Sequence, residues 1–419
     1  MFSVINSKSL TIKNAVEYAE HKTAEQGKIL EPIVLHNHLK VAQAFRTFHV
    51  SDDCFRGSTG YGYGDYGRDT LDKIYAHIFG AEAALVRPHI VSGTHALALC
   101  LFAILKPGDR LLAVTGQPYD TLLKVIGHPA VTPCSLKELG VEYGQVDLLP
   151  SGLPDYEKIA QELLKPTKMV LIQRSRGYAW RNSIDIAEIK KLISFIKKID
   201  SNIICFVDNC YGEFVEKEEP TQVQADIIAG SLIKNPGGGV APCGGYVAGR
   251  EDLVERVSYK LTAPGIGSEV ASASGTVYRL LYQGLYLAPH VVSEALKGAI
   301  YTAALFSCLG YEVSPGPEDK RSDIIQAIKL GSEEKLIEFC KALQLYSPVD
   351  SHVVPEAWDM PGYNHKVIMA GGTFVQGSTI ELSADAPLRL PYVIYLQGGL
   401  SLEYVKIAVT NAAIKLVEG

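Results

Sequence analysis

Two residues of opposite charge follow apolar runs that have the length and composition of buried strands. The run 203–207 (IICFV) leads into Asp208, and the run 226–233 (DIIAGSLI) leads into Lys234. Both runs are too continuous for half-exposed strands, so we expect each to lie in a sheet that is covered on both faces. A lone acid and a lone lysine at the ends of buried strands are costly unless each has a partner.

One cofactor chemistry would explain both residues. A lysine amine in a partly desolvated site has a lowered pKa and can form a Schiff base with a carbonyl. Pyridoxal phosphate needs such a lysine, together with an acid that keeps its pyridine nitrogen protonated. Ser231 adds a hydroxyl three residues before Lys234. The alternative is that Asp208 caps a loop and Lys234 is a solvated strand end, but their joint placement favours the cofactor.

A candidate anion site lies where an apolar helix is expected to begin. Ser92, Gly93 and Thr94 precede the apolar stretch ALALCLFAIL. Free backbone N–H groups, the helix dipole and a glycine that permits close approach favour an anion there. Ser92 could equally be an N-cap and nothing more. Both interpretations remain open on this segment alone.

Glycines and tyrosines alternate between residues 57 and 67, just before an amphipathic helix that we expect to open at Asp69. A flexible glycine-rich loop is the simple interpretation. Tyrosine, however, is easily ordered and offers a flat face and a hydroxyl, so this loop could form the wall of a site. The loop is not a dinucleotide-binding turn, because no strand precedes it and its spacing departs from GxGxxG. The residues that would face the site are Tyr61, Tyr63, Tyr66 and Arg68.

Helices and strands are expected to alternate along the first two thirds of the chain. Helical patterns cover 8–47, 156–165 and 184–199, and a buried strand is expected at 168–175. This alternation predicts an α/β fold with a mostly parallel sheet and helices on both faces. Ligands bind such sheets at the carboxyl ends of the strands. The residues predicted at those ends are Tyr119, Arg174, Asp208 and Lys234.

The expected organisation is an N-terminal helical segment at 1–56, a large domain at 57–300 and a smaller α+β domain at 301–419. The last boundary is placed between about 290 and 315, near Pro289 or the Pro315-Gly316-Pro317 turn. His36 and His38 form an HxH pair, but with no acid or cysteine cluster nearby we expect two ordinary histidines and no metal site.

Composition narrows the function classes. The chain has 419 residues and a formal net charge of -6, which argues against nucleic acid or an anionic membrane as its main partner. Its eight cysteines are scattered without a CxxC pair, as expected of reduced thiols in a cytoplasmic protein. We expect no signal peptide, and no apolar run as long as a membrane span.

Several long motifs together resemble the methionine γ-lyase-like family of aluminium resistance proteins. These motifs are GYGYGDYGRDTLDKIYAHIFGAE, VRPHIVSGTHA, VDNCYGEF, GSLIKNPGGGVAP and ADAPLRLPYVIYLQGGL. The resemblance runs nearly from end to end. It implies a pyridoxal phosphate enzyme of the aspartate aminotransferase fold (fold type I), related to cystathionine γ-synthase and β-lyase. It also implies a homodimer or homotetramer that shares site residues across its interface.

The resemblance assigns roles around the cofactor. Lys234 would form the Schiff base and move the α-proton, while Asp208 would pair with the pyridine nitrogen and keep a lowered pKa. Tyr119 would stack on the ring, and Arg389 would hold the substrate carboxylate through a bidentate contact. The phosphate would be held by Gly93, Thr94 and Ser231, and the set of expected cofactor contacts is completed by Ser92 and Arg174.

One part of the pattern departs from the better known γ-lyases. Tyr63 matches a tyrosine that reaches across the dimer interface toward the phosphate and the leaving group. Two residues further on, those γ-lyases have an arginine, whereas this chain has Asp65. Arg68 is a candidate to replace that arginine.

The expected reaction is β- or γ-elimination from a sulfur-containing amino acid, with release of a thiol, a keto acid and ammonia. Tyr119 or Tyr63 would protonate the leaving group. An aminotransferase or racemase on the same cofactor is the nearest alternative, and a pyridoxal phosphate-binding stress-resistance protein with little catalytic activity is another. A nicotinamide dehydrogenase is disfavoured, because the sequence lacks a dinucleotide-binding turn.

Overall fold

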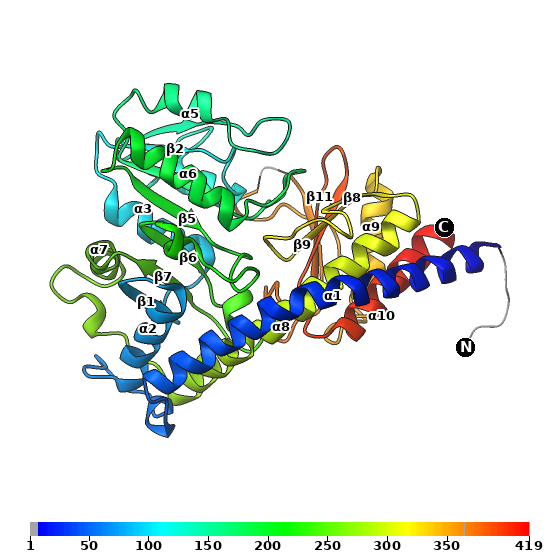
Figure 1. Ribbon diagram of the computed structural model, residues 1–419, viewed down its shortest axis with the longest axis horizontal. Coiled ribbons are helices and arrows are strands. Elements are labelled where there is room, and N and C mark those ends of the chain that lie inside the picture. The colour runs from blue at the N-terminus through cyan, green and yellow to red at the C-terminus, as the bar shows by residue number, and fades with distance from the viewer. Residues whose placement is uncertain (1–6, 364, 419) are drawn as a thin grey trace.

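The chain forms two β-sheets that lie next to each other, with two long helices running past both of them (Figure 1). The structure is a computed structural model, and it describes residues 7–363 and 365–418. The first sheet has the strand order β1-β7-β6-β5-β4-β2-β3. Its strands are β1 Ala83–Arg87, β2 Arg110–Ala113, β3 Glu142–Gln145, β4 Met169–Gln173, β5 Ile204–Asp208, β6 Ile227–Ser231 and β7 Gly245–Gly249.

The first sheet is mostly parallel, as predicted. The pairs that include β7 are antiparallel, and β2 with β3, β2 with β4, β4 with β5 and β5 with β6 are parallel. Gln173 pairs with Asp208, and Asp208 pairs with Ala229. This register brings the carboxyl ends of β4, β5 and β6 to one edge of the sheet.

Both faces of the first sheet are buried, as the continuous apolar runs predicted. In β5, Ile204 and Phe206 belong to one hydrophobic cluster, whereas Cys205 and Val207 belong to another. Helices α2 Tyr66–Phe79, α5 Tyr156–Glu162 and α6 Ile186–Ile199 cover one face. Helices α3 Gly93–Ile104, α4 Asp120–Ile126 and α7 Glu251–Leu261 cover the other. The sheet is therefore the middle layer of three.

Helix α2 begins at Tyr66, earlier than the start expected at Asp69. The side chain of Asp65 accepts a hydrogen bond from the backbone N–H of Arg68, at 3.0 Å. This contact satisfies one of the unpaired N–H groups in the first turn, which is why the helix can start there. Asp65 is thus the N-cap of α2, which gives a local structural reason for an aspartate at this position.

Two long helices, α1 Ser7–Thr47 and α8 Gly275–Cys308, pack against each other along the molecule (Figure 1). We expected no apolar run as long as a membrane span, but helix α8 has the length and composition of a helix that could cross a membrane. In the structure, 78% of its most apolar window is buried inside the protein, so it packs as a core helix. A cytoplasmic location remains a prediction.

The second sheet is antiparallel, with the strand order β10-β11-β12-β9-β8. Its strands are β8 Glu312–Ser314, β9 Ile325–Lys329, β10 Val367–Ala370, β11 Ser383–Pro387 and β12 Val393–Gln397. Helices α9 Glu333–Leu345 and α10 Leu402–Glu418 pack on it and form a second core with parts of α1 and α8.

The predicted division at residues 300 and 301 falls inside α8, which is continuous. Leu285 of this helix belongs to the core of the first sheet, and Tyr301 belongs to the core of the second. Helix α1 behaves in the same way, since Val41 lies in the first core and Ala15 in the second. The two sheets are therefore held in place by shared helices.

Candidate active site

A cavity of about 520 Å³ lies at the carboxyl ends of β5 and β6, and it is closed on its other side by segments near the second sheet. We call it the lysine cavity, because Lys234 lines it. Parallel sheets bind ligands at this edge, so its place in the fold was expected. The predicted site residues that line it are Ser92, Gly93, Thr94, Tyr119, Asp208, Ser231 and Lys234.

Lys234 lies three residues beyond the end of β6 and is partly buried. Its Nζ lies 3.8 Å from the centre of the Tyr211 ring, which is a cation–π contact. Burial acts to lower the pKa of Lys234, but Cys210, Tyr211 and Asp208 act to raise it, and the net pKa is above the usual value. The expected lowered pKa is therefore wrong for this arrangement, because the acidic neighbours outweigh desolvation.

Asp208 ends β5 and is almost completely buried. Its Oδ1 accepts a hydrogen bond from the backbone N–H of Cys210, at 3.1 Å. Burial raises the pKa of Asp208, and the nearby charge of Lys234 opposes that shift. The lowered pKa that we expected therefore requires a further cation, which a protonated pyridine nitrogen would be.

The first turn of α3 faces the lysine cavity with small residues. The Ser92 hydroxyl accepts the N–H of His95 at 3.0 Å, so Ser92 is an N-cap as well as a cavity residue. A Cβ atom at Gly93 would lie 3.3 Å from both Cys210 Sγ and Ser231 Cβ, which explains why glycine fits there. The helix N-terminus and Ser231 thus converge on one point, which favours an anionic group.

Tyr119 precedes α4, and its backbone N–H donates to Gln173 Oε1 at 2.7 Å. Its hydroxyl is hydrogen-bonded to that of Tyr363, at 2.5 Å. Tyr363, Tyr211 and Asp385 also line the lysine cavity, and we did not predict them. Tyr211 and Asp385 lie inside motifs VDNCYGEF and ADAPLRLPYVIYLQGGL, but the sequence around Tyr363 carries no strand, helix or motif signal.

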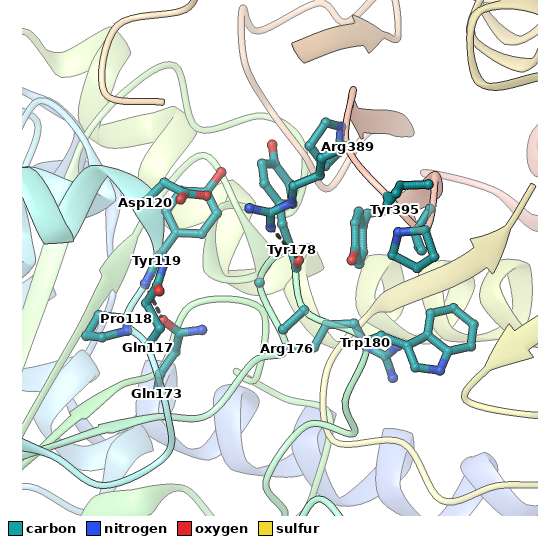
Figure 2. A pocket seen from close by; sticks show the side chains of 16 residues that line it. Gln117, Pro118, Tyr119, Asp120, Gln173, Arg176, Tyr178, Trp180, Arg389 and Tyr395 are labelled. Carbon is teal, nitrogen blue, oxygen red and sulfur yellow. Dashed lines mark hydrogen bonds between the residues drawn. The ribbon is translucent and has the colours of Figure 1, made fainter. Parts of the chain in front are cut away.

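Arg389 lies in an adjoining cavity of about 460 Å³, which we call the arginine cavity (Figure 2). One guanidinium nitrogen donates to the backbone carbonyl of Tyr178 at 2.9 Å. The carboxylate of Asp120 faces this guanidinium, and burial raises the pKa of Asp120 while Arg389 opposes that shift. Tyr119 and Gly177 line both cavities, so the two spaces adjoin there.

Arg174 lies at the end of a strand, as predicted, but its side chain does not join the other predicted cofactor contacts. It follows β4, but its guanidinium donates to Asn209 Oδ1 at 2.8 Å and to Glu216 Oε1 at 3.2 Å, and it pairs with Glu219 at 3.5 Å. It lines neither cavity and is completely buried. Arg174 is not a cofactor contact because its side chain points away from the lysine cavity. It pairs instead with Glu216 and with the buried Glu219.

Tyr63 and Arg68 also lie outside both cavities in one chain. The Tyr63 side chain is 68% exposed and its ring lies 5.5 Å from that of Tyr61. Arg68 is buried, and its guanidinium donates to the backbone carbonyls of Gly62 and Glu269 at 2.8 and 3.1 Å. Arg68 therefore holds the loop in shape. A role for Tyr63 in the site of a second subunit remains a prediction.

Comparison of the sequence with known proteins shows which family the chain is similar to. A family model described as methionine gamma-lyase matches residues 12–417. The protein YnbB of Bacillus subtilis (strain 168) is 50% identical over 421 aligned residues, which cover 100% of this chain and 99% of YnbB.

Solved structures agree with that match. The crystal structure of a carbon–sulfur lyase involved in aluminium resistance from Clostridium novyi NT is 51% identical, with a TM-score of 0.93, and the match covers 98% of this chain and 96% of that one. Cystathionine γ-synthase from Xanthomonas oryzae pv. oryzae, solved with aminoacrylate and cysteine, is 18% identical with a TM-score of 0.56, covering 85% and 87%. The latter similarity extends to the fold alone.

Proposed function

The chain belongs to the methionine γ-lyase family, and from that premise we propose that it is a pyridoxal phosphate-dependent enzyme of fold type I. We propose further that it cleaves a carbon–sulfur bond of an amino acid by β- or γ-elimination. The observation that supports this most is the convergence of Lys234, Asp208 and the N-terminus of α3 in one cavity.

The residues of the lysine cavity fit the three reactive parts of the cofactor. The first turn of α3 and the Ser231 hydroxyl suit a phosphate, and Gly93 leaves the space for it to approach. Asp208 is a buried carboxyl that a protonated ring nitrogen would stabilise. Lys234 presents an amine to the same space. When bound, pyridoxal phosphate supplies an aldehyde that condenses with amines and a ring that stabilises negative charge at the substrate α-carbon.

The substrate would extend from the lysine cavity into the arginine cavity. Arg389 would bind its carboxylate, since a guanidinium fork matches a carboxylate in two hydrogen bonds. Lys234 would remove the α-proton. With Asp208 paired to a ring nitrogen, one of the groups that raise the pKa of Lys234 is offset, and more of the amine is in the unprotonated form that can accept the α-proton. Tyr119 would donate its hydroxyl proton to the leaving sulfur, because its hydroxyl lies in the same cavity.

A product assay tests the reaction class. The protein is loaded with pyridoxal phosphate and incubated with S-substituted cysteines and homocysteines, and thiol, keto acid and ammonia are measured. We expect the three products in equal amounts. Amino transfer to an added keto acid without ammonia would instead show an aminotransferase, and appearance of the D-enantiomer a racemase. A loaded protein that turns over none of these amino acids would contradict the proposal and favour a binding role.

We also propose a homo-oligomer in which Tyr63 completes the site of a neighbouring subunit. The supporting observation is that Tyr63 and Tyr61 are exposed, in a loop that the buried Arg68 holds, yet line neither the lysine cavity nor the arginine cavity of their own chain. Mixing and reassembling inactive Tyr63→Phe and Lys234→Ala subunits would restore part of the activity if sites are shared. No recovery in mixed oligomers would contradict the shared site.

A further inference from the structure

The hydroxyls of Tyr119 and Tyr363 meet in the lysine cavity, although the residues come from opposite sides of it. Tyr119 precedes α4, next to the first sheet, and Tyr363 precedes β10 of the second sheet. Their oxygens are 2.5 Å apart, and either one could be the donor. Each hydroxyl can therefore donate to the other while the other donates its own proton elsewhere.

Packing fixes the position of this pair. The rings of Tyr178 and Tyr363 are stacked with centres 5.8 Å apart, and the Tyr119 ring stands edge-on to Tyr178 at 5.3 Å. The Tyr178 hydroxyl donates to Asp385 Oδ2 at 2.9 Å, and Gln397 donates to the same oxygen at 2.7 Å. The hydrogen bond to Asp385 thus fixes the Tyr178 ring, and the rings of Tyr119 and Tyr363 pack against it.

The state of the two hydroxyls suits an acid. Burial raises the pKa of Tyr119 well above its usual value, and burial also raises the pKa of Tyr363. Both phenols are therefore protonated near neutral pH. A phenolate formed at either oxygen would accept a hydrogen bond from the other phenol, and charge-assisted hydrogen bonds of this kind are the stronger ones.

We propose that Tyr119 and Tyr363 act as one acid, in which Tyr119 protonates the leaving sulfur and Tyr363 holds the phenolate that results. This inference rests on the proposed elimination. The carbon–sulfur bond breaks and its electron pair passes to sulfur, which takes the proton of the Tyr119 hydroxyl. Lys234 carries the former α-proton of the substrate as an ammonium and returns a proton to Tyr119, so no other acid is consumed.

The pair also links substrate cleavage to the second sheet. Tyr119 lies on the side of the cavity next to the first sheet and Tyr363 on the side next to the second, so the pair forms where the two sides meet. Full acid strength is thus available only when both sides of the cavity are in place.

Substitution Tyr363→Phe, compared on two kinds of substrate, tests the pair. S-Alkyl cysteines release a basic thiolate that needs a proton, whereas 3-chloroalanine releases chloride, which does not. Loss of acid assistance typically costs about 10²-fold or more. We expect kcat on S-alkyl cysteines to fall by about 10- to 100-fold, because Tyr119 remains, and kcat on 3-chloroalanine to change by less than about threefold. The control is Tyr259→Phe, whose hydroxyl donates to the exposed Glu255 one turn earlier in α7, at 2.8 Å.

A second readout needs neither cofactor nor turnover. In protein labelled at the tyrosine Cζ carbons, the NMR signal of Tyr119 should shift in Tyr363→Phe and stay in place in Tyr259→Phe. If Tyr363→Phe does not fold, the reciprocal measurement is made: the NMR signal of Tyr363 is compared between wild type and Tyr119→Phe.

The outcomes separate this inference from the proposed function. Equal losses on both substrates, or no loss on S-alkyl cysteines, would overturn the acid pair while elimination itself stands. An unshifted Tyr119 signal would overturn it as well. A wild-type protein that eliminates neither thiol nor chloride would overturn both proposals.

Discussion

The lysine cavity and the arginine cavity share a wall at Tyr119 but are built differently. The lysine cavity places Asp208, Ser231 and Lys234 at or just beyond the ends of two neighbouring parallel strands. The arginine cavity places Asp120 at the first residue of α4 and Arg389 on the loop after β11, among aromatic rings (Figure 2). Under the proposed function, the difference teaches a division of labour, in which the strand ends carry the base and the groups that hold the cofactor, and the arginine cavity carries the charge that binds the substrate carboxylate.

The substitution Lys234→Ala is the strongest test of the proposed difference in role between the two cavities. If bond chemistry depends on the lysine cavity, kcat on any substrate should fall by more than about 10³-fold, because the base and the attachment point are lost together. Steady-state assays of the loaded protein measure the loss. The matched control is Lys191→Ala on the exposed side of α6, which should match wild type. A Lys234→Ala protein with wild-type turnover would contradict the assignment.

Asp208→Asn should be the next largest effect. An amide cannot hold a positive charge on a ring nitrogen, so we expect kcat to fall by about 100-fold, which corresponds to about 2.7 kcal/mol. Absorbance of the bound cofactor checks that the site is still filled. Its control is Asp252→Asn, an exposed residue at the start of α7. If Asp208→Asn binds less cofactor but keeps the wild-type kcat per loaded site, Asp208 contributes to cofactor binding and not to the chemical step.

A buried acid beneath the lysine cavity should make stability depend on pH. Glu213 is fully buried, its Oε1 accepts from the Tyr246 hydroxyl at 2.9 Å, and burial raises its pKa from 4.5 to about 8. In the unfolded chain this carboxyl loses its proton near 4.5, whereas the folded chain keeps it. The free energy of unfolding should therefore fall as pH rises from 4.5 to 8, by at most about 1.4 kcal/mol per pH unit.

Urea titrations of the cofactor-free protein at several pH values measure this dependence, and Glu213→Gln provides the comparison. Glutamine cannot ionise, so the variant should show a flatter profile through the same window. Parallel profiles for wild type and variant would show that Glu213 does not keep its proton in the folded state.

The smallest of these effects should come from the arginine cavity. Arg389→Lys keeps the charge but loses the planar fork, so we expect KM to rise about tenfold with little change in kcat. The control is Arg256→Lys on the exposed face of α7. A fall in kcat as large as that for Asp208→Asn would mean that Arg389 takes part in bond chemistry, and the two cavities would no longer differ in role.

The sequence predicted the first sheet and the lysine cavity better than the rest, for physical reasons. The runs before Asp208 and Lys234 are local patterns, and parallel strands bring their ends together whatever the loops do. The direction of the Arg174 side chain was not predicted, because alternation along a strand does not show which way the residue after its end turns. Tyr363 was missed because its position depends on long-range packing against Tyr178 and Tyr119.

The pKa of Lys234 and the continuity of helix α8 across the predicted boundary could not be predicted for related reasons. The direction of the Lys234 shift depends on acidic groups that the fold brings around it, and these outweigh the burial that the strand pattern implied. The continuous helix α8 joins both cores, and Pro289 lies inside it without ending it. A proline in a sequence therefore does not by itself mark a domain boundary, because a helix that packs on both sides of the proline can continue through it.

The central claim is that Lys234 holds pyridoxal phosphate in the lysine cavity. The most direct test is the visible absorption spectrum of the protein after incubation with pyridoxal phosphate and removal of the excess, before and after borohydride, followed by peptide mapping. We predict a yellow band that borohydride bleaches, with one pyridoxyl group left on Lys234 and none in Lys234→Ala. A protein that stays colourless, or an adduct on a different lysine, would contradict the claim.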